Sequence, residues 1–303
     1  METRDNITGS ARVYSSIGLV LEGGAMRGLY SAGICDVLME SGIELGGIVG
    51  VSAGAAFGCN VKSRQAGRPL RYNQRFAHDW RYCSLRSLVT TGDLFGADYA
   101  YHRIPNEMDV FDNDAFEQNP VRFWAVCTDV ETGEPVYRLL ERGGDETFDW
   151  IRASASMPLC SRVVELDGLK LLDGGVADSI PLQFMEQQGF VYNIVVLTQP
   201  PAYVKLRNKF LPLMRISKLR KYPCFLDAVA RRHEMYNAEL EYVRRQEAAG
   251  RCLVFRPDEP LQIGHTSHDE AEMQRVYDIG RAQATARLDE VIAFLDKSNA
   301  HIS

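Results

Sequence analysis

The sequence lacks the features of membrane-spanning, disulfide-bonded and nucleic-acid-binding proteins. No uninterrupted apolar run approaches the ~20 residues that a bilayer-spanning helix needs. The polar N-terminal stretch, Met1 to Asn6, contains no apolar core of a secretory signal. The seven cysteines include no CxxC pair, which argues against a zinc site or a disulfide framework. A net charge of −6 argues against a nucleic-acid partner. These absences predict a cytoplasmic protein.

What the sequence does contain is a strand–helix alternation typical of α/β proteins. With 303 residues, 46% of them hydrophobic, the chain can bury a sizeable core. Residues 17–21 and 47–51 are strand-like runs that end in glycines, and a helical pattern follows each of them. This βαβ pattern predicts a three-layer α/β/α sandwich with a mostly parallel central sheet.

The remaining segments extend this fold. Residues 62–122 hold no clear period and are expected to form helices and loops over one end of the sheet, with a lid role left open. Ser267 opens a capping-box pattern that predicts one long helix to about residue 296. Further strands are predicted at 121–128, 136–140, 163–166, 169–172, 191–197 (as a central strand) and 251–255. The simplest organisation is a lead-in (1–16), one α/β domain (17–198) and a mostly helical C-terminal extension packed on that domain (199–303).

Two glycine-rich turns follow the first two strands. The first reads Gly23-Gly24-Ala25-Met26-Arg27-Gly28, and it would present backbone N–H groups at the N-terminus of a helix. The second reads Gly50-Val51-Ser52-Ala53-Gly54, and its G-x-S-x-G spacing between a strand and a helix is the nucleophile-elbow pattern. A serine beside a cluster of amide donors indicates acyl-transfer chemistry.

A base for Ser52 is harder to find among the histidines. None of the six follows a convincing core strand in a small-residue turn, although His102 and His265 remain alternatives. A carboxylate is better placed: Asp173 directly follows the apolar run 169–172 and precedes Gly174 and Gly175. If that strand lies in the same sheet, Asp173 would emerge near its carboxyl end, where active sites of α/β sheets gather.

These three motifs, in this order, resemble those of the patatin-like phospholipase family in its bacterial form. The resemblance covers residues 17–198 and includes the helix that ends at Ala155-Ser156-Met157-Pro158. It implies a serine acyl hydrolase that acts on lipid or other carboxylic esters through a Ser52–Asp173 dyad without histidine. For such an enzyme we expect no metal or organic cofactor. The resemblance assigns the oxyanion hole to Gly23, Gly24, Ala25, Met26, Arg27 and Gly28, with Gly50, Gly54, Gly174 and Gly175 as motif support.

Two positions in this pattern need comment. Ala25 stands where many family members have glycine; it keeps the backbone N–H but requires a φ angle that tolerates a Cβ atom. Arg27 has two readings: it could neutralise a lipid phosphate or support the oxyanion loop, or it could pair with a neighbour such as Glu22. A cation at a helix N-terminus is electrostatically unfavourable, which favours a functional role.

Residues 204–221 carry seven cations interleaved with apolar residues and no acid. This composition fits peripheral contact with an anionic membrane, and it also fits a solvated surface segment. Two alternatives to a hydrolase stay open: an acyltransferase that uses the same dyad, and a non-catalytic protein whose glycine loop binds phosphate or acyl groups.

Overall fold

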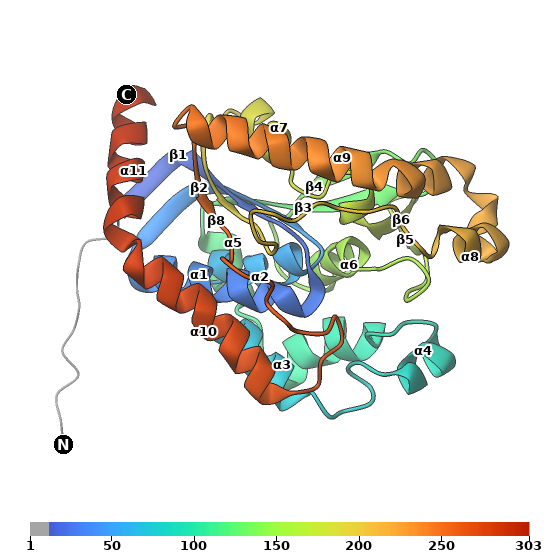
Figure 1. Ribbon diagram of the computed structural model, residues 1–303. Helices are drawn as coiled ribbons and strands as arrows, with labels where there is room; N and C mark the ends of the chain where they lie inside the picture. The colour runs from blue at the N-terminus through green and yellow to red at the C-terminus, as the bar shows by residue number, and fades with distance from the viewer. Residues whose placement is uncertain (1–11, 303) are drawn as a thin grey trace, which may run out of the picture.

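The computed structural model describes residues 12–302, and its centre is an eight-stranded mixed sheet (Figure 1). The strand order is β5-β6-β3-β2-β1-β7-β8, with β4 also paired to β3. The parallel strands are β1 (Arg12–Leu21), β2 (Ile43–Val51), β3 (Arg122–Asp129), β7 (Tyr192–Val196) and β8 (Cys252–Phe255). The antiparallel ones are β4 (Pro135–Leu139), β5 (Val164–Leu166) and β6 (Leu169–Asp173). The prediction of a mostly parallel sheet is confirmed.

Helices cover both faces of the sheet. Successive side chains of each buried strand point to opposite faces and pack against the helices on each side. In β1, Leu19 and Leu21 belong to the core under α1, α2 and α10, whereas Val20 belongs to the core under α7 and α9. Figure 1 shows α9 along one face of the sheet and α1, α2 and α10 along the other. These helices are α1 (Gly28–Glu40), α2 (Ala53–Lys62), α7 (Leu182–Gln187), α9 (Pro223–Ala248) and α10 (Glu270–Ala286). The α/β/α sandwich is therefore confirmed.

The C-terminal part of the chain packs closely on the helix that follows the first glycine loop. A Cβ atom added to Gly33 of α1 would lie 2.2 Å from the Tyr277 carbonyl oxygen, and one added to Gly280 of α10 would lie 2.1 Å from the Tyr30 carbonyl oxygen. Glycine at both positions lets the two helix backbones approach closely. Strand β8, from the same part of the chain, extends the central sheet beside β7.

The prediction of one long C-terminal helix is wrong. The chain forms α10 and then α11 (Leu288–Ile302), with Arg287 between them in a non-helical conformation. The Arg287 side chain donates a hydrogen bond to the Val254 carbonyl oxygen (2.8 Å) and pairs with Glu290 (2.7 Å). The hydrogen bond to Val254 fixes the junction between α10 and α11 against β8. The N-cap of α10 is Asp269, not Ser267.

Two other sequence predictions need correction. Strand β1 begins at Arg12, so residues 12–16, assigned to the lead-in, are part of the sheet, while residues 1–11 lie outside the described residues. Strand β7 is flanked by β1 and β8 and is next to the edge of the sheet, not central.

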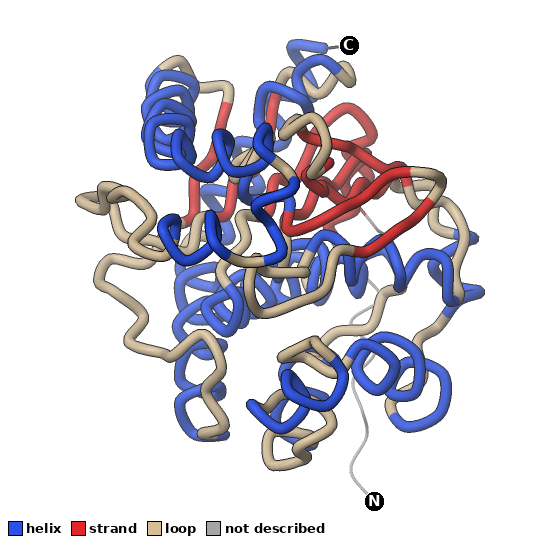
Figure 2. Tube along the Cα trace, turned by 90° about the vertical axis from the view of Figure 1, so that its right-hand side faces the viewer, coloured by secondary structure: helices blue, strands red, loops and turns tan. Residues whose placement is uncertain are grey.

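Residues 62–122 form helices and loops at one end of the molecule, as predicted. Figure 2 views the molecule from the end that carries α4 and α8 (Leu211–Ile216). The helices of this region are α3 (Arg68–Arg75), α4 (Leu85–Thr91), the π-helix η2 (Tyr99–Met108) and α5 (Asn113–Gln118), and α6 (Asp145–Ser154) follows β4. A π-helix is uncommon and is frequently found at functional sites. Among the described residues, no helix is both long enough and apolar enough to span a bilayer.

Candidate active site

Ser52 occupies a tight turn between β2 and α2. Its φ and ψ angles are 55° and −120°, a backbone conformation that residues with a Cβ atom rarely adopt. Glycine is required on both sides: a Cβ atom on Gly50 would lie 2.5 Å from the Ala55 nitrogen, and one on Gly54 would lie 2.3 Å from the Leu21 carbonyl oxygen. The turn has the geometry of a nucleophile elbow, with Ser52 at its tip.

The buried side chain of Ser154 holds the Ser52 turn in place through two hydrogen bonds. The Ser52 amide donates to the Ser154 hydroxyl (2.9 Å), and that hydroxyl donates to the Val126 carbonyl oxygen of β3 (2.6 Å). Helix α6, which supplies Ser154, therefore links the elbow to the adjacent strand.

Asp173 reaches the same place because two strands share one edge of β3. β2 pairs with β3 as far as Val51 opposite Val126, and β6 then pairs with β3 from Asp173 opposite Cys127. Because β4 occupies the other edge of β3, β2 and β6 lie on the same edge, one after the other. The residue after Val51 is thus brought beside Asp173. The expectation that Asp173 lies in the same sheet is confirmed, but its strand is antiparallel to β3.

The Asp173 carboxylate is buried and held by short-range contacts. Its Oδ1 accepts a hydrogen bond from the Gly175 amide (2.8 Å). Burial raises the pKa of Asp173 above its ordinary value, while the Arg232 guanidinium and then a hydrogen bond from the Ser52 side chain act to lower it. A buried carboxylate with a raised pKa that shares a cavity with a serine is a candidate base for that serine.

The first glycine loop faces this pair. It includes the short helix η1 (Ala25–Arg27), and Ala25 has φ = 49°, in the left-handed region that favours glycine. A Cβ atom on Gly23 would lie 2.9 Å from the Ser52 Cβ atom, so the loop backbone and the elbow are in close contact. Gly23, Gly24, Ala25 and Arg27 line a cavity together with Ser52 and Asp173.

Two residues assigned to the oxyanion loop lie elsewhere. Met26 is buried and lines a separate apolar pocket, described below. Gly28 packs on α2, where an added Cβ atom would lie 2.8 Å from the Ala53 Cβ atom. Some loop residues therefore line the cavity at Ser52 and Asp173, whereas Met26 and Gly28 pack on the apolar side of the elbow.

Arg27 does not follow the suggested pairing with Glu22. Its Nη1 is 3.0 Å from the Nε2 atom of His265. The Glu22 carboxylate instead accepts hydrogen bonds from the Tyr236 hydroxyl (2.6 Å) and the Thr198 amide (2.5 Å). Burial, and then the Arg27 guanidinium, lower the pKa of His265. His265 therefore lies at the cavity as a partner of Arg27.

His102, the other histidine left open by the sequence, lies on η2. Its Nε2 is 3.2 Å from Asp149 of α6 and its Nδ1 is 3.3 Å from Asp145. Among residues 12–302, His265 is the only histidine that lines the cavity with Ser52.

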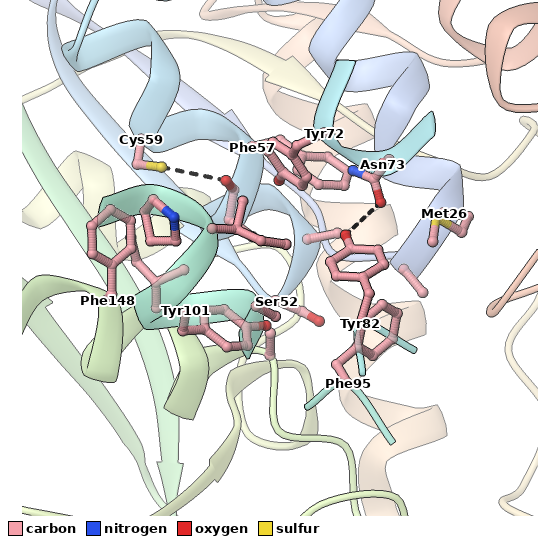
Figure 3. Close-up of a pocket in the computed structure, with 18 of the residues that line it drawn as sticks. Met26, Ser52, Phe57, Cys59, Tyr72, Asn73, Tyr82, Phe95, Tyr101 and Phe148 are labelled. Atoms are coloured by element: carbon pink, nitrogen blue, oxygen red, sulfur yellow. Dashed lines mark hydrogen bonds between the residues drawn. The ribbon is translucent and has the colours of Figure 1, made fainter. Parts of the chain in front are cut away.

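An apolar pocket opens on one side of Ser52 (Figure 3). Residues 62–122 build one of its walls, including Tyr101 and Ile104 of the π-helix η2. The Tyr82 hydroxyl at this pocket donates a hydrogen bond to Asn73 Oδ1 (2.7 Å). The other side chains around it are mostly apolar, among them Met26, Ala56, Phe57, Tyr72, Phe95, Ala100, Phe148, Ile151 and Met157.

The cavity on the other side of Ser52 is cationic; we call it the cationic pocket. Arg27, Lys205 and Arg232 line it together with Glu22, Asp173, Tyr236 and His265. Ala25, Ser52 and Met157 line both pockets. The sequence did not identify Lys205, Arg232 or Tyr236 as site residues. Lys205 lies within the cation-rich segment, but the other two are indistinguishable by pattern from their neighbours in the charged helix α9.

No group of three or more His, Cys, Asp or Glu side chains in the described part of the chain could hold a metal ion. The groups that line the site are a serine, a buried carboxylate, residues of the glycine loop and three cations.

Comparisons with known proteins agree with this fold. A family described as "Patatin-like phospholipase" matches residues 19–185, and a "Domain of unknown function (DUF6363)" matches residues 222–296. The chain belongs to the patatin-like phospholipase family.

Curated relatives include an uncharacterized protein YjjU from Escherichia coli, 25% identical over 88% of this chain and 75% of that protein. The lysophospholipase NTE1 from Debaryomyces hansenii is 30% identical over 95% of this chain. The chain spans only 20% of that fungal protein and 17% of its counterpart from Coccidioides immitis. Among solved structures, VipD from Legionella pneumophila aligns with 91% of this chain and 67% of its own, at 13% identity and a TM-score of 0.47.

Proposed function

We propose that this protein is a serine acyl hydrolase that cleaves carboxylic esters of lipids with a Ser52–Asp173 dyad. The observation that carries the proposal is the buried Asp173 carboxyl in the same cavity as Ser52, which stands at the tip of a strained elbow. Membership of the patatin-like phospholipase family and the similarity to the fungal lysophospholipases support a lipid ester as substrate.

The chemistry proceeds in two halves. Ser52 Oγ attacks the ester carbonyl carbon while Asp173 accepts the hydroxyl proton, and collapse of the tetrahedral adduct expels the alcohol, which takes that proton. Water then attacks the acyl-enzyme, passes a proton to Asp173 and releases the fatty acid as Ser52 recovers its proton. The acyl chain occupies the apolar pocket during both halves.

The negative charge on the carbonyl oxygen needs hydrogen-bond donors in the glycine loop. The Arg27 amide already donates to the Gly24 carbonyl oxygen (3.1 Å), and the Gly28 amide donates to carbonyl oxygens of η1. We therefore assign the oxyanion hole to the amides of the loop residues that line the cavity and are not engaged in this way, Gly23, Gly24 and Ala25.

Fluorophosphonate labelling tests the nucleophile. The wild type is expected to incorporate one label on Ser52, whereas Ser52→Ala incorporates none and Asp173→Asn labels much more slowly. Equal labelling of the wild type and Ser52→Ala would reject the mechanism. Incubation with an acyl donor and glycerol distinguishes an acyltransferase, which would form more glyceride than free fatty acid.

We further propose that residues 204–221 contact an anionic lipid surface. Leu206, Phe210, Leu213 and Ile216 are 50–75% exposed, and six cations of the segment are exposed beside them. Exposed apolar side chains flanked by cations suit a surface of anionic head groups. In liposome flotation, replacing Arg207, Lys209, Arg215, Lys218 and Arg220 with Gln should reduce recovery with anionic vesicles. Equal recovery of the variant and the wild type would remove this proposal.

A further inference from the structure

The cationic pocket contains more positive charge than its own acids neutralise. Arg27, Lys205 and Arg232 face two carboxylates, Glu22 and Asp173, so three positive and two negative charges leave +1. Among the described residues, none of the three cations forms an ion pair with a carboxylate within salt-bridge distance. The Nε atoms of Arg27 and Arg232 are buried without a hydrogen-bond partner in residues 12–302. Buried donors of this kind call for an acceptor that the pocket itself lacks.

Lys205 is held in place by α9. The Asn237 side chain accepts a hydrogen bond from the Lys205 amide (2.9 Å) and donates one to the Lys205 carbonyl oxygen (3.1 Å). The Lys205 ammonium lies 4.3 Å from the centre of the Tyr236 ring. The pKa of Lys205 is lowered to about 8 by burial and by Arg232, so the side chain remains mostly charged at neutral pH.

Arg232 precedes Tyr236 by one helical turn and therefore lies on the same face of α9. Its Nη2 would be 2.9 Å from a Cβ atom on Gly175, which places the guanidinium directly against the Asp173-Gly174-Gly175 turn. Glycine at position 175 thus leaves room for a cation beside the dyad.

The two pockets meet at Ser52, so an ester bound there extends into both. With the acyl chain in the apolar pocket, the leaving alcohol lies in the cationic pocket. The cationic pocket offers little to a quaternary ammonium: the Tyr236 ring face is already occupied by the Lys205 ammonium, and both Glu22 oxygens accept internal hydrogen bonds.

We propose that Arg27, Lys205 and Arg232 form a subsite for an anionic leaving group, and that the protein prefers lipid esters whose head group carries a phosphate without a choline. A single phosphodiester charge would neutralise the pocket, and guanidinium groups bind phosphate oxygens well. This inference rests on the proposed hydrolase function.

The test uses the full chain and short-chain substrates below their micellar concentrations, so that no lipid surface contributes. We would measure kcat/KM for lysophosphatidylglycerol, lysophosphatidylcholine and monoacylglycerol with the same acyl group. The wild type is expected to prefer lysophosphatidylglycerol over each of the other two by about tenfold or more. Lys205→Gln and Arg232→Gln should each reduce these ratios, and Lys205→Arg should retain them.

The matched control is Arg231→Gln, which removes an exposed cation next to Arg232 on the same helix and should leave the ratios unchanged. Equal rates on the three substrates in the wild type, or ratios that Lys205→Gln and Arg232→Gln leave unaltered, would overturn the subsite. A wild type that is strongly inhibited by inorganic phosphate but shows no preference among the three head groups would also overturn the subsite, because the three cations would then bind a free anion. If Ser52→Ala retains full activity, the proposed function itself fails, whatever the ratios.

Discussion

The two pockets beside Ser52 differ in chemistry and in the part of the chain that builds them. All residues named around the apolar pocket lie within 25–157, inside the segment that matches the patatin-like family. The cationic pocket combines the glycine loop with Lys205, Arg232, Tyr236 and His265, which follow that segment. Under the proposed function, the family segment would supply the reaction centre and the acyl side, and the C-terminal part would contribute cations to the leaving-group side.

Among substitutions that separate the two pockets, the largest effect is expected in the loop that serves both. In Gly23→Ala, the added Cβ atom would lie 2.9 Å from both the Ser52 Cβ atom and the Val51 carbonyl oxygen, so the loop must move. We expect ester hydrolysis to fall by about 10²–10³-fold on every substrate, because the oxyanion donors would be misplaced. Gly264→Ala is the control, since an added Cβ atom there has nothing closer than 3.9 Å. Full activity of Gly23→Ala in an ester assay would contradict the role of the loop.

A substitution in the apolar pocket should change chain-length preference alone. Ala56 lines this pocket one turn after Ser52, and Ala56→Phe would fill the space that we propose for the acyl chain. The ratio of kcat/KM for long-chain over acetyl esters is expected to fall about 10–100-fold. Ala293→Phe, on an exposed position of α11, should leave the ratio unchanged. A uniform loss across chain lengths would mean that the acyl group lies elsewhere.

In the cationic pocket, the preference for anionic substrates should depend on pH. The pKa of Lys205 is lowered to about 8, so the lysine loses its charge as the pH rises through that value. Arg27, Arg232, Glu22, Asp173 and His265 also face this pocket. Above pH ~9, the lysophosphatidylglycerol-to-monoacylglycerol ratio should decline by up to about tenfold in kcat/KM, which reports on the free enzyme. In Lys205→Arg the ratio should stay flat over the same range; a decline there too would assign the titration to another group.

The smallest effect concerns stability and should spare both pockets. Glu239 of α9 is hydrogen-bonded to the amides of Ser179 and Ile180, and burial together with Asp178 raises its pKa well above the ordinary value. The folded state therefore binds a proton that the unfolded state releases, and the stability this contributes is lost as the pH rises from about 4.5 through the folded pKa. Glu239→Gln should flatten the dependence of Tm on pH, whereas Glu234→Gln, exposed on the same helix, should not. If Tm changes with pH to the same extent in the wild type, Glu239→Gln and Glu234→Gln, Glu239 does not carry a buried proton.

The sequence was sufficient for the parts of the site that backbone geometry dictates. Strands that end in glycines, the elbow around Ser52 and the turn after Asp173 are local patterns, and the structure forms each of them. The cationic pocket was not predictable in this way. Arg231 and Arg232 are chemically identical neighbours, and only the packing of α9 on the sheet turns the second toward Asp173. The helix break at Arg287 likewise depends on a contact with Val254, which no local pattern encodes.

Both pockets have a functional meaning only if Ser52 and Asp173 act as one unit. The most direct test is kcat/KM on a short-chain ester for Ser52→Ala, Asp173→Asn and the double variant. We predict that each single variant loses about 10³-fold or more and that the double variant is no worse than the poorer single one, because residues that act together are not additive. Losses that multiply in the double variant, or near-normal activity of either single variant, would contradict the dyad.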